Sequence, residues 1–213
     1  MTFQDRHSAG RQLGNRLSGL FKSQPVIVVG LTNGGVPVGF EIARSLGAPL
    51  DVFFVRPDHV PEHFERRERH CRMGRHARSL SGRVVIVADD GVATGATVRG
   101  ALIALRGAGA HRLVVAVPVA AQTALDQIHE LADAVVCLRV LPEVAAIGLE
   151  FQHFGPVTDE DIQELLDQAR TSVRHRRSHR SERRPRSPVR RSILDPVGAE
   201  FERVPAPGDS PSP

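Results

Sequence analysis

Two adjacent carboxylates stand between an apolar stretch and a helical pattern near the middle of the chain. Residues 84–87 are apolar and mostly β-branched, which predicts a short buried strand. Asp89 and Asp90 follow it, and small or hydroxyl-bearing residues then fill 91–97. The apolar residues of 98–105 recur with the spacing of an amphipathic helix. The sequence therefore predicts a strand, an acid pair, a small-residue loop and the start of a helix.

A loop of this kind in front of a helix is typical of an anion-binding site. Backbone N–H groups can converge there without side chains in the way, and the helix dipole adds positive potential. The carboxylates would repel a bare phosphate, so we expect them to hold hydroxyl groups or a divalent cation. A ligand with a sugar diol, a phosphate and a metal-bound polyphosphate satisfies both halves of the pattern.

The stretch DDGVATGAT at 89–97 resembles the phosphoribosyl-pyrophosphate (PRPP) loop of the type I phosphoribosyltransferases. Segments 28–56, 65–75 and 157–166 are similar to a bacterial branch of predicted phosphoribosyltransferases, and the resemblance covers roughly residues 3–170. A Rossmann-like loop for another nucleotide is the alternative. That fingerprint is rich in Gly before its helix and carries its acid about 20 residues later, so the acid pair argues against it.

The resemblance implies transfer of phosphoribose from PRPP to a nucleophile, with release of pyrophosphate. The acids would hold the ribose 2′ and 3′ hydroxyls directly or through Mg²⁺, which makes them the candidate catalytic and metal-binding residues. A second loop would contact the pyrophosphate, although its two glycines are equally consistent with a tight turn. The implied PRPP-binding residues are Asp89, Asp90, Gly91, Val92, Ala93, Thr94, Gly95, Ala96 and Thr97. The implied pyrophosphate residues are Thr32, Asn33, Gly34, Gly35 and Arg56.

Several positions depart from the resembled pattern. Asn33 stands where the branch usually has Arg, and Pro57 stands where Lys commonly follows the preceding Arg. Relatives have a longer segment than 56–82, including a mobile loop that closes over the reacting centre. Asp58–Phe64 could form only a short lid. Ala93 stands where purine salvage members of the family carry an acid, which disfavours a hypoxanthine- or guanine-type acceptor, and the acceptor is left unknown. Because the changes at Asn33, Pro57 and 56–82 weaken the case for catalysis, a catalytically impaired PRPP- or nucleotide-binding regulator is the second hypothesis.

The surrounding pattern alternates strands and helices, which predicts an α/β fold with a parallel sheet and helices on both faces. A helix with His59 and His63 on one face could hold a metal ion, but Pro61 is expected to interrupt it, so a metal site there is disfavoured. Phe151 and Phe154 are expected to pack in the core rather than stack on a base. The expected strands are 26–30, 50–55, 84–87, 112–119 and 134–138. The expected helices are a first one with Leu13, Leu17, Leu20 and Phe21 on one face, one between Pro37 and Gly47, one over 98–105, one at 121–131, and one starting at Thr158.

Charge divides the chain into a predicted domain at 1–170 and a tail at 171–213. Residues 1–169 carry 17 Lys and Arg against 19 Asp and Glu, whereas residues 170–213 carry 11 against 5. The tail has little apolar periodicity, so we expect it to be disordered. Its arginines could contact nucleic acid weakly through electrostatic attraction, and a nucleic-acid binder is therefore a third hypothesis. Because no aromatic residues are interleaved with these arginines, a solvated tail without a dedicated partner is the preferred interpretation.

The composition favours a cytoplasmic protein that does not enter a membrane. No apolar run approaches the roughly 20 residues of a membrane helix, and the N-terminus lacks a secretory pattern. Cys71 and Cys137 are far apart in the sequence, which suits a reducing compartment. The sequence does not fix an oligomeric state, and a homodimer is one option.

Overall fold

The computed structural model describes residues 2–21, 24–55 and 61–182, without the side chains of 61–64 and 173–182. Arg56, Pro57 and the beginning of the short lid at Asp58 lie outside the described residues. The same is true of the predicted tail from residue 183 onward.

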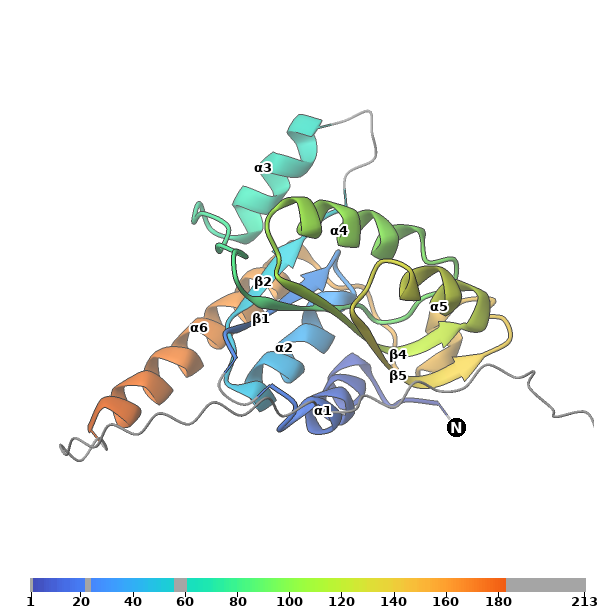
Figure 1. The fold of residues 1–213 in the computed structure, drawn as a ribbon, viewed down its shortest axis with the longest axis horizontal. Helices are drawn as coiled ribbons and strands as arrows, with labels where there is room; N and C mark the ends of the chain where they lie inside the picture. Colours follow the sequence, from blue (N-terminus) through green and yellow to red (C-terminus); the bar gives the residue numbers. More distant parts are fainter. Residues whose placement is uncertain (1, 22–23, 56–60, 183–213) are drawn as a thin grey trace, which may run out of the picture. The chain divides into compact units, whose positions relative to one another are not determined.

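Five parallel strands form one sheet in the order β2-β1-β3-β4-β5 (Figure 1). The strands are β1 (Val26–Leu31), β2 (Leu50–Phe53), β3 (Val84–Ala88), β4 (Arg112–Ala121) and β5 (Ala134–Leu141). This topology confirms the predicted α/β class. In the pairing of β1 with β3, Gly30 lies opposite Ala88, so the loops that follow these two strands begin side by side.

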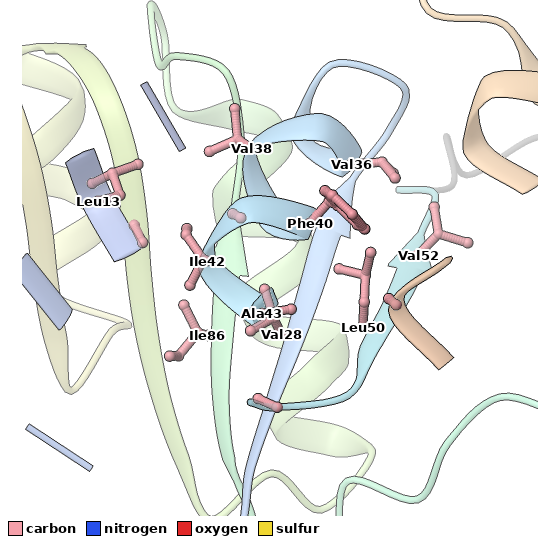
Figure 2. Close-up of a cluster of buried hydrophobic side chains, with 14 of the residues drawn as sticks. Leu13, Val28, Val36, Val38, Phe40, Ile42, Ala43, Leu50, Val52 and Ile86 are labelled. Atoms are coloured by element: carbon pink, nitrogen blue, oxygen red, sulfur yellow. The ribbon is translucent and has the colours of Figure 1, made fainter. Parts of the chain in front are cut away.

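Helices cover both faces of the sheet because its strands bury alternate residues on opposite sides. Val28 and Ile86 pack against α1, α2 and α6 (Figure 2), whereas Ile27 and Val85 pack against α4 and α5. The predicted inward face of α4 is buried throughout. The helices are α1 (Arg6–Leu17), α2 (Gly35–Leu46), α3 (Pro61–Cys71), α4 (Ala96–Gly107), α5 (Gln122–His129), the 3₁₀ turn η1 (Ile147–Glu150) and α6 (Asp159–Glu182).

One local expectation about helices is wrong. Leu20 is 45% exposed, because the chain leaves the helix at Ser18 and turns at Gly19 with φ +90°. Pro61 begins α3, so His63 is on this helix, whereas His59 lies outside the described residues. Proline suits the first turn of a helix, where its missing N–H would have no partner in any case.

Helix α6 starts where the sequence predicts. The Thr158 hydroxyl accepts the Asp161 N–H at 3.1 Å, and the Asp161 carboxylate accepts the Thr158 N–H at 2.8 Å. This reciprocal arrangement is a capping box. The helix continues to Glu182 and so crosses residue 170, where the sequence predicts the end of the domain. The division into a domain at 1–170 and a tail at 171–213 stays a prediction.

A buried ion-pair network fixes α3 to β2. Arg72 is 6% exposed, and its Nε donates to Asp51 Oδ1 at 2.8 Å. Its Nη1 donates to Glu68 Oε2 at 3.0 Å. The network holds the Arg-rich helix beside the strand, near the edge of the sheet where the candidate loops lie.

Cys71 is buried and Cys137 is half-buried, and both are free thiols. Within the described ranges, no helix is long and apolar enough to cross a membrane. The cytoplasmic location and the homodimer stay predictions.

Candidate functional site

The loop between β3 and α4 is anchored to the neighbouring strand at one point. Val92 forms a bridge to β4, donating its N–H to the Val119 carbonyl at 2.9 Å and accepting the Ala121 N–H at 2.9 Å. Gly95, at φ +80°, then turns the chain into α4 without a side-chain cap. Glycine tolerates this left-handed conformation at no steric cost.

The N-terminal end of α4 presents unused hydrogen-bond donors. Among the described residues, no protein acceptor meets the backbone N–H groups of 93–97. The Thr94 and Thr97 side chains are exposed beside them. Open amides at a helix start attract anions through hydrogen bonding and the helix dipole. This loop can therefore receive a phosphate without displacing a protein group.

The two acids lie at the base of this loop. Asp89 is only 7% exposed and accepts the backbone N–H of Asp90 at 2.9 Å. Burial, and then the charge of Asp90, raises the pKa of the Asp89 carboxyl well above its usual value. Asp90 reaches toward the other loop, because a Cβ on Gly34 would lie 2.0 Å from its Oδ2. The acids therefore join the two predicted loops into one site.

The second loop is packed too tightly for side chains at its glycines. A Cβ on Gly35 would lie 2.3 Å from the Ala88 carbonyl oxygen. Thr32 has φ +49°, an uncommon conformation for a residue with a side chain. Gly34 caps α2 without a side-chain hydrogen bond. The close approach of the loops by itself requires these glycines.

Asn33 connects this loop to two other elements. Its Nδ2 donates to the Val157 carbonyl at 2.6 Å, and its Oδ1 accepts from Arg67 Nη2 at 2.8 Å. Arg67 also pairs with Asp159 at 2.7 Å, and this hydrogen bond lowers the pKa of the Asp159 carboxyl. The guanidinium lies 4.6 Å from the centroid of the Phe54 ring. Sequence reasoning missed Arg67, because nothing in the local pattern of α3 indicates which of its arginines faces the loop.

Arg6 is the second residue that the sequence did not reveal. Its Nε donates to Asp90 Oδ2 at 2.8 Å, and its Nη1 donates to the Gly155 carbonyl at 2.8 Å. The guanidinium carbon lies 3.7 Å from the centroid of Phe154. Asp90 and Arg6 are 84 positions apart, so only the tertiary fold brings them together.

An isolated β-bridge at Phe3 explains how Arg6 reaches Asp90. Phe3 donates its N–H to the Glu150 carbonyl and accepts the Gln152 N–H, each at 2.8 Å. Phe3 also packs against Phe151, which is buried as expected. Phe154 is 38% exposed instead of lying in the core, since its ring covers the Arg6 guanidinium.

The acid pair is chemically suited to Mg²⁺, which prefers carboxylate and other oxygen ligands. In the described part of the chain, no group of three or more His, Cys, Asp or Glu side chains could hold a metal ion. Asp89 and Asp90 would therefore need further oxygen ligands from a bound molecule or water. The residues fit a cation that arrives with an oxygen-rich substrate.

Comparisons with known proteins identify the family of this chain. The model of the phosphoribosyl transferase domain family matches residues 6–152. A protein of Mycobacterium tuberculosis H37Rv, whose name gives phosphoribosyl transferase as an unproven activity, is 34% identical over 78% of this chain. The chain spans about half of that relative's length, 47%. An orotate phosphoribosyltransferase of Pyrobaculum islandicum is 35% identical over 39% of this chain and 38% of its own.

A solved structure extends the likeness to three dimensions. The crystal structure of TT1426 from Thermus thermophilus matches with a TM-score of 0.72 at 34% identity, covering 78% of this chain and 98% of that one. The family match covers most of the chain and includes both loops and the acid pair. The chain belongs to the phosphoribosyltransferase family.

Proposed function

We propose that this chain is a PRPP-dependent transferase that moves 5-phosphoribose to an acceptor and releases pyrophosphate. The observation that carries the proposal is the set of open amides at 93–97 beside the two acids. Amide donors suit the 5′-phosphate, and carboxylates suit the ribose hydroxyls. Both features lie at one edge of the sheet, where α/β proteins place their ligands.

Each group has a distinct task in the proposed reaction. The amides and the hydroxyls of Thr94 and Thr97 bind the 5′-phosphate, while Asp89 and Asp90 hold the ribose 2′ and 3′ hydroxyls. The bond from the anomeric carbon to the pyrophosphate oxygen breaks, and the acceptor's lone pair forms the new bond. Holding the sugar at both ends aligns the reacting carbon and lowers the entropic part of the barrier. Mg²⁺, when bound, neutralises charge on the leaving pyrophosphate.

The space for the acceptor is a cavity of about 470 Å³ whose wall includes Arg6, Pro37 and Gly155. This volume lies in the usual range for small-molecule sites. Arg6 also contacts Asp90, so the cavity borders the acid pair.

A PRPP-binding regulatory protein without turnover is the second candidate. The ion pair between Arg6 and Asp90 supports it, because the acid that should meet ribose already has a cationic partner. The short segment at 56–82 supports it as well, since less chain is present to exclude water from the site.

Calorimetric titration of PRPP with and without Mg²⁺ tests the proposed ligand. Asp90→Asn should weaken Mg²⁺-dependent binding at least tenfold, because it removes one of the two sugar-binding charges. Asp167→Asn is the matched control, since Asp167 is exposed on α6. Wild-type affinity in the Asp90 variant would reject the assignment.

Pyrophosphate release across a panel of bases and amines then separates the two candidates. Release with any acceptor supports the transferase. Tight PRPP binding without release across the whole panel supports the regulator.

A further inference from the structure

Helices α1 and α2 pack against each other with almost no space between their backbones. A Cβ on Gly10 would lie 2.7 Å from the Val38 carbonyl oxygen, and a Cβ on Gly14 would overlap the Ser45 side chain. Glycine at these two positions of α1 therefore permits the close approach. Asp5 caps the start of α1 through a side-chain hydrogen bond. The first turn of α1 is thereby held beside the middle of α2.

This packing brings a histidine against a buried carboxylate. His7 lies in the first turn of α1, and its Nδ1 is 3.1 Å from Oε1 of Glu41 on α2. The Glu41 side chain is 4% exposed, and its charge is balanced by ion pairs with Arg44 at 2.7 Å and Arg11 at 3.6 Å. An ionised carboxylate can only accept a hydrogen bond, so Nδ1 of His7 carries the hydrogen. A neutral ring then keeps its lone pair on Nε2.

The other edge of this ring is free. The His7 side chain is 41% exposed and forms part of the wall of the 470 Å³ cavity proposed for the acceptor. In the described part of the chain, Nε2 has no hydrogen-bond partner. Phe40 meets the ring edge to face, with the two ring centroids 6.3 Å apart and the planes at 79°. Packing and the hydrogen bond to Glu41 therefore fix an imidazole whose lone pair is accessible from the cavity.

His7 also lies next to the proposed sugar site. Arg6, the preceding residue, donates to Asp90 Oδ2 at 2.8 Å and lines the same cavity. The cavity therefore borders both the acid pair and the free nitrogen of His7. An acceptor bound there can reach His7 while it faces the sugar.

We propose that His7 is the general base that takes a proton from the acceptor, and that Glu41 is the residue that positions it. This inference rests on the proposed function. The lone pair of an acceptor nitrogen forms the bond to the anomeric carbon, while the bond to pyrophosphate breaks and its electron pair leaves with the pyrophosphate oxygen. The N–H proton of the acceptor moves to His7 Nε2 and later to water. A positioned base of this kind contributes about 10²–10⁴-fold to a rate.

Charged groups around the cavity favour the imidazolium that this step forms. Asp5, Asp161 and Glu164 contribute three carboxylates to the wall. Among the described lining residues, Arg6 is the single arginine, and its charge is already paired with an acid of the sugar site. His153 is the second histidine on the wall and lies on the loop before α6. Because this negative surrounding disfavours an anionic acceptor, the acceptor class is a neutral or cationic nitrogen compound that carries an N–H.

A purely structural role for the pair makes a different prediction. If His7 and Glu41 served only to join α1 to α2, replacing His7 would change stability and leave the reaction rate and its pH dependence as they are. A base acts only when it is unprotonated. If His7 is the base, the rate therefore rises with pH as a histidine loses its proton, ordinarily near about pH 6.5, and this rise disappears with the imidazole.

The experiment measures pyrophosphate release from PRPP with Mg²⁺ by the full chain between pH 5 and 8. Adenine and uracil serve as nitrogen acceptors and water as the background acceptor, because none of them titrates in this range. We expect His7→Gln to lower kcat about 100-fold or more and to abolish the rise with pH, while the affinity for PRPP stays at the wild-type value. Titration of the PRPP phosphates is common to all variants, so it cancels in the comparison.

Two further variants complete the series. Glu41→Gln keeps the shape of the side chain without its charge and should lower kcat about tenfold or more, with PRPP affinity unchanged. His129→Gln is the matched control, because His129 is exposed on α5 and does not line the cavity. It should keep the wild-type rate and pH profile.

Chemical rescue separates a lost base from a damaged fold. His7→Ala leaves space beside Glu41, so added imidazole should raise the rate of this variant at least tenfold and leave that of the His129 control unchanged. A His7→Ala protein that imidazole does not rescue would contradict the base role.

The remaining outcomes distinguish this inference from the proposed function. Equal kcat and equal pH profiles in wild type and His7→Gln would overturn the base role, and so would a parallel loss of PRPP affinity in that variant. Wild-type protein that binds PRPP but releases no pyrophosphate would overturn it as well and favour the regulator. Failure of wild-type protein to bind PRPP with Mg²⁺ would instead reject the proposed function.

Discussion

Adding one methyl group at Gly34 should disable the acid pair without straining the backbone. Gly34 has φ −66° and ψ −32°, which alanine adopts readily. Its Cβ, however, would lie 2.0 Å from Asp90 Oδ2 and 2.5 Å from the Asp90 carboxyl carbon. The carboxylate must rotate away, and its 2.8 Å hydrogen bond to Arg6 is then lost.

The size of the effect follows from that lost bond. A hydrogen bond to a charged group contributes about 1.5–3 kcal/mol. Replacing glycine by alanine in a compatible conformation returns about 0.4–1 kcal/mol through the unfolded state. The net loss of about 1–2 kcal/mol corresponds to a fall in Tm of roughly 2–8 °C for a domain of this size. PRPP affinity should fall at least tenfold, since the displaced acid no longer faces the sugar.

Thermal unfolding and a PRPP titration measure the two effects on one sample. Gly107→Ala is the matched control, because a Cβ there meets nothing within 4 Å. The control should melt at or slightly above the wild-type temperature and bind PRPP normally. A Gly34 variant that behaves like this control would refute the close packing of Asp90 against the second loop.

Two further variants test the electrostatics of the fold. Asp89→Asn should raise the free energy of unfolding of the ligand-free protein at neutral pH. Burial raises the folded-state pKa of Asp89, so wild-type stability falls as pH rises from about 4, the unfolded value, toward the folded pKa. Denaturation from pH 5 to 8 should show this decline in wild type and a smaller one in the variant; parallel curves would contradict it. Arg72→Met should cost about 3–5 kcal/mol in urea denaturation, because it leaves two buried carboxylates unpaired. A loss below about 1 kcal/mol would show that the network is not buried in solution.

The parts of the fold that could be predicted depend on local patterns. The β3 strand, the following loop and the buried face of α4 are contiguous, so hydrophobic periodicity was enough to find them. The start of α6 could also be predicted from local sequence, because its two capping residues are three positions apart. Parallel strand order then predicted that the loops after β1 and β3 share an edge.

The missed features depend on contacts between distant residues. Arg6 meets Asp90 across 84 positions, and Arg67 meets Asn33 across 34. Neither arginine differs from its neighbours in local sequence, so only the packing of α1 and α3 selects them. The departure at Asn33 was visible in the sequence, whereas the arginine beside it became visible only in the structure.

A crystal structure of the protein with PRPP and Mg²⁺ is the most direct test of the central claim. The account predicts the 5′-phosphate against the backbone amides of 93–97, with Asp89 and Asp90 facing the ribose hydroxyls. Phosphate density elsewhere, or acids that stay turned away from the sugar, would contradict it.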